Sequence, residues 1–325
     1  MKFPYLSSAS IGDAEISAAF AEFTQTYEKA YESDEVAEYR RKVFEINYRK
    51  IQEYNQQSSK TCTLGVNKFA DLTDEEFEKK HLSKPIQPNY REPKPKKYQE
   101  PNENVEINWV EKGKVAPVKD QGLCGSCWTF SAISVVETLV AIKDNKSPER
   151  YSEQQLVDCC ITEDSHGCDG GEDSDAFDYL ARKGIALDSQ YPYLAIDDEC
   201  KDTKVPMRVN ITGHVDISSG NNTEMENAIQ GRTLSVGLAA GPYVFRFYKK
   251  GVVTTGCPGD HITHAVTVVG AGTEDGIPYW LVRNSWGPNW GDKGYLKIAR
   301  SPDGTTGVCG IACCAQYPLY NEHAK

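Results

Sequence analysis

The sequence predicts an α+β protein in which helical segments come first along the chain and antiparallel strands come last. Three observations lead to this class. The charged residues 14–58 place apolar side chains at helical spacing, and residues 127–160 hold two more helical segments. Short runs rich in Val, Ile and Tyr, separated by glycine-rich turns, appear late in the chain. We therefore expect the part after about residue 104 to form two subdomains.

The N-terminal helices are predicted from one apolar stripe. Phe44, Tyr48, Ile51 and Asn55 recur every three or four residues, and residues 14–58 contain neither Pro nor Gly. Further on, Thr73-Asp74-Glu75-Glu76 has the pattern of a capping box, which predicts the start of another short helix.

A proline-rich stretch then separates two parts of the chain. Five prolines with Lys and Glu between them exclude a helix or a central strand here: Pro85, Pro88, Pro93, Pro95 and Pro101. An extended, exposed linker is a natural place for proteolytic cleavage.

The second part begins with helices and continues with strands. Residues 127–143 and 152–160 are predicted as helices, and Ser152-Glu153-Gln154-Gln155 is a second capping-box pattern. Residues 265–269, 279–282 and 295–299 are predicted as antiparallel strands.

Composition excludes several classes of protein. The 325 residues are enough for two domains at ~150 residues each. No window approaches the ~20 consecutive apolar residues of a membrane span. The net charge is −11, so nucleic acid and anionic lipid are not expected partners.

The cysteines indicate an oxidising compartment. Ten of the eleven follow residue 120, which suggests disulfides in the second part and passage through the secretory route. Asn145, Asn210 and Asn221 begin candidate glycosylation triplets. No apolar signal segment is visible near Met1, and we expect that it was removed before this numbering began.

The strongest chemical signal is Cys124-Gly125-Ser126-Cys127-Trp128, preceded by Gln121. It matches a local signature of cysteine nucleophiles. A cysteine in the first turn of a helix lies at the positive end of the helix dipole, which favours the thiolate.

A base and an orienting residue follow downstream. His264 precedes a predicted buried strand, 137 residues after Cys127, and Asn284 could fix its ring orientation. His261 is a second candidate base, but the strand pattern favours His264. The other four histidines are expected at the surface: His81, His166, His214 and His323.

Two less specific patterns are set aside. Cys124 and Cys127 could form a redox pair or half a zinc site, but a βαβ context and a second ligand pair are both missing. Gly270-Ala271-Gly272 is too short for a nucleotide-binding fingerprint and is read as a turn.

With these stretches together, the chain resembles papain-like cysteine peptidases of the cathepsin L type, in their proenzyme form. The resemblance implies a helical subdomain beside an antiparallel β-barrel subdomain, and a Cys127–His264–Asn284 triad. Gln121 would complete an oxyanion hole with the Cys127 N–H. Trp286 would shield the His264–Asn284 contact, and Trp290 would line the cleft beyond the cut bond.

The N-terminal part resembles the family's inhibitory prodomain. One motif is matched by Arg40, Phe44, Asn47, Ile51 and Asn55, and a second by Gly65-Val66-Asn67-Lys68-Phe69-Ala70-Asp71. The first motif's leading Glu is Val36 here, which puts one salt bridge in doubt. We expect an inhibitory prodomain at 1–84, a linker with the activation cleavage region at 85–103, and a catalytic domain at 104–325.

The resemblance also implies three disulfides: Cys124–Cys168, Cys159–Cys200 and Cys257–Cys309. It leaves Cys160, Cys313 and Cys314 unassigned, and a fourth bridge from Cys160 to Cys313 or Cys314 is a hypothesis. Cys62 is expected to be a free thiol.

The resemblance places the substrate along Gly170 and Gly171, by strand addition. It assigns six residues to the pocket for the second side chain upstream of the cut: Glu172, Asp173, Gly237, Ile262, Ala265 and Cys314. Two acids replace the usual apolar groups, so we expect this pocket to tolerate Arg or Lys. The alternative is that both acids face solvent.

The expected function is a thiol-dependent endopeptidase, made as a zymogen, that cuts peptide bonds through an acyl-enzyme. Only six residues separate Tyr193 from Cys200, so there is no room for a cleft-blocking insertion. The alternative is an inactive homologue that only binds protein, although Cys127, His264 and Asn284 are all present.

No metal or other cofactor is implied, and the expected partners are protein substrates and the chain's own prodomain, in a monomer. An acidic lysosome-like lumen or secretion is the expected location. Acid should weaken the prodomain's carboxylate contacts, with Asp71 as one sensor.

Overall fold

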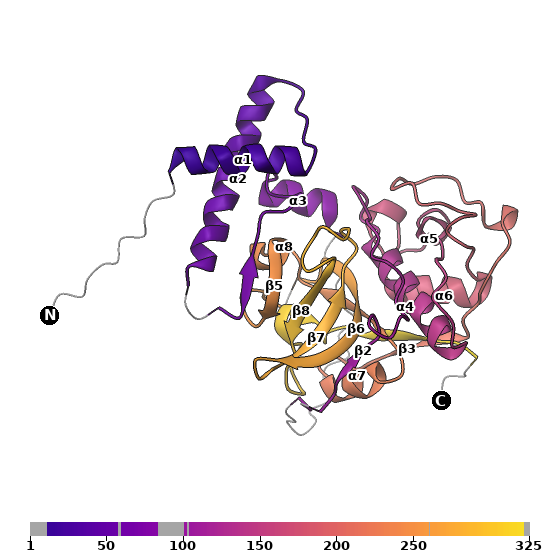
Figure 1. The fold of residues 1–325 in the computed structure, drawn as a ribbon. Helices are drawn as coiled ribbons and strands as arrows, with labels where there is room; N and C mark the ends of the chain where they lie inside the picture. The colour runs from indigo at the N-terminus through magenta and orange to yellow at the C-terminus, as the bar shows by residue number, and fades with distance from the viewer. Residues whose placement is uncertain (1–11, 58–59, 84–100, 103, 260, 322–325) are drawn as a thin grey trace.

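The computed structural model describes residues 12–57, 60–83, 101–102, 104–259 and 261–321 (Figure 1). It confirms the α+β class: helices lie on both sides of the molecule and a large, mostly antiparallel sheet lies between them. Most of the proline-rich segment lies outside the described residues, so its predicted role as a linker stays a prediction.

Three helices form the N-terminal part: α1 (Asp13–Thr26), α2 (Asp34–Asn55) and α3 (Asp74–His81). The stripe on α2 is buried at Phe44 and Ile51, and α1 contributes Phe23, whose ring centroid lies 5.0 Å from that of Phe44. The capping box at the start of α3 is confirmed, because Thr73 and Glu76 exchange both bonds.

Within its described residues, the second part contains five α-helices. They are α4 (Cys127–Lys143), α5 (Glu153–Cys159), α6 (Asp173–Lys183), α7 (Asn222–Ile229) and α8 (Tyr243–Arg246). Helix α4 begins at the cysteine predicted from the sequence, and residues 127–141 are buried. It is mostly apolar and buried on all sides, as expected of a central helix.

The capping box predicted for α5 is only half correct. Ser152 accepts the bond from the Gln155 N–H, but the Gln155 amide points elsewhere and donates to the Tyr179 hydroxyl and the Gly184 carbonyl. The Gln155 side chain therefore bonds to distant residues and not to the backbone N–H of Ser152.

The sheet has nine strands: β1 (Cys62–Leu64), β2 (Ile107–Asn108), β3 (Gly213–Asp216), β4 (Leu234–Leu238), β5 (Tyr248–Val253), β6 (His264–Glu274), β7 (Ile277–Arg283), β8 (Tyr295–Ala299) and β9 (Gln316–Leu319). The order is β1-β5-β8-β7-β6-β4-β9-β3, with β2 beside β6, and only β5 and β8 are parallel.

The three strands predicted from the sequence are confirmed as β6, β7 and β8, with longer bounds for the first two. Strands β1, β2, β3, β4, β5 and β9 were not predicted. Strand β1 belongs to the N-terminal part but pairs with β5, so that part adds an edge strand to the sheet of the second part.

Two apolar cores meet near the middle of the molecule. One is built on α4, α5 and α6, and the other on the sheet together with aromatic residues of the N-terminal part. Cys127 lies at the start of α4 and His264 at the start of β6, so both stand where the two cores adjoin.

Three disulfides are present, and they are the pairs that the resemblance implied: Cys124–Cys168, Cys159–Cys200 and Cys257–Cys309. Five cysteines are free: Cys62, Cys127, Cys160, Cys313 and Cys314. The hypothesis of a bridge from Cys160 is wrong, because its buried thiol instead donates to the Asp175 carbonyl at 3.4 Å.

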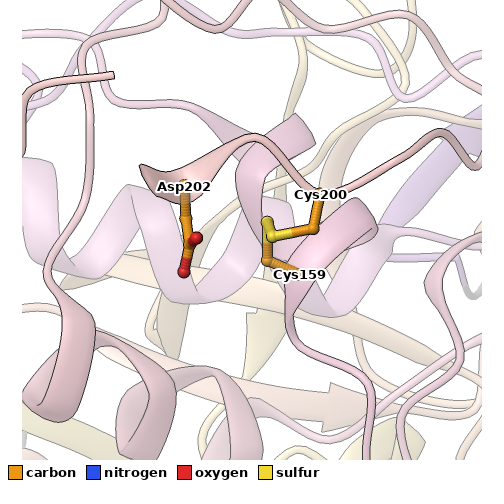
Figure 2. Close-up of side chains that lie close together, drawn as sticks. All are labelled: Cys159, Cys200 and Asp202. Carbon is orange, nitrogen blue, oxygen red and sulfur yellow. A yellow bond between two sulfur atoms is a disulfide. The ribbon is translucent and has the colours of Figure 1, made fainter. Parts of the chain in front are cut away.

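One disulfide has a carboxylate beside it. Figure 2 shows Asp202 next to the Cys159–Cys200 bridge. Both sulfur atoms are already covalently bonded, and Asp202 accepts a hydrogen bond from Tyr179, so this group is a structural bridge and not a metal centre.

Candidate active site

Cys127 is fully buried at the first turn of α4. Burial raises the pKa of its thiol above the usual value, while the Ser83 hydroxyl, 3.2 Å from Sγ, lowers it. The helix terminus favours negative charge at this position. The thiol is thus held protonated by a cover that residue 83 helps to form.

His264 and Asn284 are brought together as expected. The His264 Nε2 lies 2.8 Å from the Asn284 Oδ1, and the indole of Trp286 stacks on the imidazole with ring centroids 4.6 Å apart. Burial lowers the pKa of His264 to about 4, so the imidazole is neutral at ordinary pH. Its buried Nδ1 has no hydrogen-bond partner within the described part of the chain, which leaves it free to take a proton.

The Gln121 side chain is buried beside Cys124, and both ends of its amide are hydrogen-bonded. Its Nε2 donates to the Cys124 carbonyl at 2.9 Å and to the His81 carbonyl at 3.4 Å. The Ser285 hydroxyl donates to its Oε1 at 2.7 Å and fixes the amide orientation. A carbonyl of the N-terminal part thus occupies a donor that catalysis would use.

The pocket residues on the sheet are also brought together. Gly237 pairs with Ala265 across β4 and β6. A methyl group added at Gly237 would come within 2.6 Å of the Ile262 Cγ2 and 2.7 Å of the Cys314 Sγ. Only glycine leaves room for these two side chains.

The acids at the start of α6 are not both in solvent. The Asp173 Oδ1 is buried without a hydrogen-bond partner among the described residues. Burial raises the pKa of Asp173 to about 8, and burial also raises that of Glu172 to about 7. Next to them, Gly171 packs so closely on Trp128 that a Cβ would lie 2.6 Å from its ring, and Gly170 has a φ of 114°.

Residues of the N-terminal part cover this constellation. Ser83 donates to the Gly125 carbonyl at 3.2 Å, and its own N–H donates to the Thr263 carbonyl at 2.9 Å. Phe69 and Phe77 pack edge-on against Trp286, with ring centroids 5.3 and 5.4 Å away. The cleft is therefore closed by the chain itself.

His81 corrects a sequence-based expectation. It was expected at the surface, but it is buried between Phe69 and Phe77, and its Nδ1 lies 3.2 Å from the Gly122 carbonyl. Neither His81 nor Ser83 was predicted as a functional residue, because the sequence gives no local signal for where the end of α3 docks.

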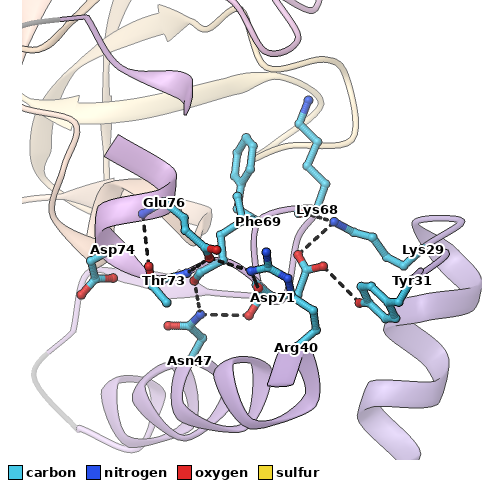
Figure 3. Close-up of polar contacts among 12 residues, drawn as sticks. Lys29, Tyr31, Arg40, Asn47, Lys68, Phe69, Asp71, Thr73, Asp74 and Glu76 are labelled. Carbon is cyan, nitrogen blue, oxygen red and sulfur yellow. Dashed lines mark hydrogen bonds and ion pairs between the residues drawn. The ribbon is translucent and has the colours of Figure 1, made fainter. Parts of the chain in front are cut away.

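Figure 3 shows the polar contacts that hold this covering segment. Asp71 accepts bonds from Lys29 at 2.9 Å and from the Tyr31 hydroxyl at 3.1 Å, and Asn47 donates to the carbonyls of Ala70 and Leu72. Arg40 pairs with Glu76 at 2.6 Å, although Val36 stands at the motif's leading Glu.

A buried arginine of the second part anchors the same segment. Arg246 donates to the Phe69 and Leu72 carbonyls, each at 2.6 Å, and pairs with Asp74 at 3.1 Å. Its guanidinium also lies 4.8 Å from the Phe77 ring centroid. Burial lowers the pKa of Arg246 to about 10, so it keeps its charge.

The remaining predicted site residues divide by exposure. Asn145 and Asn210 are exposed, as glycosylation requires. Asn221 is buried and its side chain caps α7, so the prediction of a glycan there is wrong for the folded chain.

Trp290 is buried next to Trp286, and its indole N–H donates to the Arg246 carbonyl. Its expected place in the cleft stays a prediction.

Two family models match the chain. Residues 104–319 match the papain family cysteine protease model, and residues 20–77 match the cathepsin propeptide inhibitor domain. The described residues contain no helix that is both long and apolar enough to cross a membrane.

Curated relatives match over nearly the whole chain. A digestive cysteine proteinase 2 of Homarus americanus is 38% identical over 331 residues, covering 98% of this chain and 100% of that protein. A senescence-specific cysteine protease SAG39 of Oryza sativa subsp. indica is 36% identical, covering 94% and 91%.

Solved structures give the same result. A recombinant stem bromelain precursor superposes with a TM-score of 0.84 at 32% identity, covering 94% of this chain and 99% of that one. The proform of the ragweed pollen cysteine protease Amb a 11 superposes with a TM-score of 0.83 at 31% identity, covering 99% and 100%.

Proposed function

Because the chain belongs to the papain family of cysteine proteases and carries a cathepsin-type propeptide, we propose that Cys127, His264, Asn284 and Gln121 carry its catalysis. One observation supports this most. The Cys127 thiol lies at the start of α4, and the His264 imidazole, at the start of β6, is hydrogen-bonded to the Asn284 amide oxygen at 2.8 Å. The alternative of an inactive binding protein is less well supported, because the relatives are named as proteases.

The reaction follows from these groups. Once uncovered, the Cys127 thiolate attacks the peptide carbonyl, and the Gln121 amide and the Cys127 N–H donate to the oxyanion. His264 protonates the leaving amine through Nδ1, while Asn284 holds Nε2. Water then enters, His264 takes its proton, and the acyl-enzyme is hydrolysed.

The protein is made as a zymogen, and in proforms of relatives the propeptide is present on the same chain. Here the Ser83 hydroxyl contacts the Cys127 thiol, and the His81 carbonyl accepts a hydrogen bond from the Gln121 amide. We place the inhibitory unit at 1–84, cleavage within 85–103 and the catalytic unit at 104–325. We propose that acid releases the cover, and the ion pair of Asp71 with Lys29 is one of the contacts that hold the covering segment to the N-terminal helices.

The pocket suggests which substrates are chosen. The resemblance assigns Glu172 and Asp173 to it, and the buried Asp173 carboxyl, which lies beside the Ser131 and Ser235 hydroxyls, is a site where an Arg or Lys side chain would gain an ionic partner. We propose that the second residue upstream of the cut can be basic, with cleavage inside chains, in an acidic vacuole or outside the cell. Trp290 would lie beyond the cut bond.

A peptide series tests this specificity. We expect the ratio of kcat/KM for Arg over Leu at that position to fall about tenfold in Asp173→Asn or Glu172→Gln, one pKa unit of interaction. Glu163→Gln, an exposed acid nearby, is the matched control. A ratio that the pocket variants leave unchanged would refute the proposal.

The same ratio should depend on pH. The carboxyls are largely protonated below their raised pKa values of about 7 and about 8, and only the ionised forms attract Arg. The Arg/Leu ratio should therefore rise with pH as these carboxyls ionise, and Asp173→Asn should lose this rise.

A further inference from the structure

Two adjacent cysteines remain unexplained by the proposed mechanism. Cys313 and Cys314 lie in the turn between the short helix Val308–Gly310 and β9. Their Sγ atoms are 2.6 Å apart. A covalent S–S bond measures about 2.05 Å, and ordinary non-bonded contacts of heavy atoms about 3.5–4.0 Å. The two sulfur atoms are therefore already close to bonding distance.

The backbone around the pair is fixed from both sides. The Cys313 N–H donates to the Gly310 carbonyl, and the Ala312 N–H to the Thr306 carbonyl, each at 2.8 Å. The N–H groups of Gly220 and Ile217 donate to the carbonyls of Ala312 and Ala315, also at 2.8 Å. These bonds restrain the main chain on both sides of the two thiols.

The pair lies at the proposed substrate pocket. A methyl group at Gly237 would come within 2.7 Å of the Cys314 Sγ and 3.8 Å of the Cys313 Sγ. Gly237 pairs with Ala265, the residue after the proposed base. Asp173 lies close enough to both Cys127 and Cys314 to interact with each of them when it is ionised. A covalent change at this pair would therefore alter the wall that a substrate side chain contacts.

We propose that Cys313 and Cys314 are a vicinal dithiol that is reversibly oxidised to a disulfide, and that this bond changes which substrate side chain the pocket accepts. The oxidant class is a low-molecular-weight disulfide such as glutathione disulfide. Only the link to substrate choice rests on the proposed function.

The exchange has two balanced steps. Cys314, which as a residue is less buried than Cys313, loses its proton, and its thiolate attacks the small disulfide, which gives a mixed disulfide and one small thiolate. The Cys313 thiolate then attacks the Cys314 sulfur and expels the second small thiolate. Two protons and two electrons pass from the pair to the oxidant, which ends as two thiols.

The surroundings make this exchange sensitive to pH. The hydrogen bond with Cys313, burial and the Asp173 charge all raise the pKa of Cys314. The thiolate is the attacking species, so oxidation should be faster near neutral pH than in acid. Cys160 is separate, since its thiol donates to the Asp175 carbonyl.

Mass spectrometry of the full chain tests the bond. Cys127→Ala, which removes the proposed nucleophile, is treated with glutathione disulfide, unfolded in denaturant at low pH, and alkylated without reductant. We expect the peptide with residues 313 and 314 to carry no alkyl group and to be lighter by two hydrogen atoms. Alkylation of both thiols, or a link to Cys160, would overturn the proposal.

Substrate ratios test the consequence. In the active enzyme, the Arg/Leu ratio of kcat/KM cancels any loss of Cys127 to oxidation, because both substrates use the same thiol. We expect oxidant to change this ratio at least about threefold and reductant to restore it. Cys160→Ser should keep the response, and the pair variant Cys313→Ser with Cys314→Ser should lose it.

The outcomes separate the two proposals. A bond with an unchanged ratio would overturn the link between the pair and substrate choice. If the reduced enzyme cuts neither peptide, the proposed function fails, while the mass measurement still decides whether the bond forms. Cys314→Ser alone serves if the double variant does not fold.

Discussion

At the scale of single residues, the proposed chemistry depends on how His264 is held. The imidazole lies between the Asn284 oxygen at 2.8 Å and the Trp286 ring, and its other nitrogen is left for the nucleophile. The third member of such a triad fixes the tautomer and orientation of the base. Losing it should leave the thiol and the cleft in place but weaken proton transfer.

Asn284→Ala should therefore lower kcat/KM by at least about tenfold, mainly through kcat. The pH dependence of thiol alkylation in the active enzyme would show whether the imidazole has been disturbed. Asn289→Ala, an exposed asparagine in the same loop, is the control. Equal activity of the two variants would argue against the role given to Asn284.

A second residue-scale prediction concerns the anchor of the prodomain. Arg246 is fully buried and donates to two carbonyls of the covering segment. Hydrogen bonds to charged groups contribute about 1.5–3 kcal/mol each. Arg246→Met keeps the apolar stem but leaves those carbonyls unpaired, so the zymogen should release its cover more readily.

We expect the pH of half-maximal processing to move upward in Arg246→Met. Arg41→Ala, which removes an ion pair between exposed parts of the N-terminal helices, should leave it in place. A processing profile of Arg246→Met that matches the wild type would show that the anchor has no part in docking.

At the scale of elements, α3 and the two residues after it decide how tightly the cleft is closed. His81 at the end of α3 is buried beside Phe69 and Phe77, with Lys68, Asp120 and Arg246 as the charged groups that act on it. Burial, assisted by Lys68, lowers the pKa of His81 to about 4, so the docked segment holds a neutral imidazole.

The sign of the pH effect follows from linkage. When the segment is released, His81 has an ordinary pKa near 6.5 and binds a proton. In the docked segment, the same imidazole stays unprotonated at that pH. As pH falls from about 6.5 towards about 4, release becomes more favourable by up to about 1.4 kcal/mol per unit. The hydrogen bond from Arg40 lowers the pKa of Glu76, so the loss of that contact requires more acid than an ordinary glutamate would.

His81→Gln, which cannot be protonated, should therefore shift half-maximal processing to lower pH. Chain mass followed across a pH series measures this. Asp71→Asn is the comparison, because it removes the other proposed sensor while leaving the histidine. An unchanged profile for His81→Gln would assign acid sensing to the carboxylates alone.

Some elements could be predicted from sequence and others could not. The stripe on α2, the cap of α3 and the start of α4 depend on neighbouring residues, and all three are confirmed. Strand β1 could not be predicted, because its three residues are extended only through pairing with β5. The half-correct cap at Gln155 and the burial of His81 likewise depend on distant segments.

At the scale of the whole molecule, the N-terminal part and the catalytic part share one apolar core and one sheet. Phe69 and Phe77 belong to that core, which also contains Trp286. The closed state is thus part of the folded molecule, and release has to expose apolar surface.

The closure also explains the neutral state of the catalytic pair. Burial raises the pKa of Cys127 and lowers that of His264, so both groups are uncharged under the cover. When the cover leaves, water returns, both pKa values move towards their ordinary range, and the thiolate and imidazolium can form. Activation is therefore a change of solvation as well as of access.

The most direct test labels the full chain with a thiol-directed epoxide at neutral and at acid pH, while chain mass and peptide hydrolysis are followed. We predict no label on the intact chain at neutral pH. In acid, one label should appear on Cys127 together with shortening of the chain and hydrolysis, and Cys127→Ala should show none of these. Labelling of the intact neutral chain, or hydrolysis by Cys127→Ala, would contradict the account.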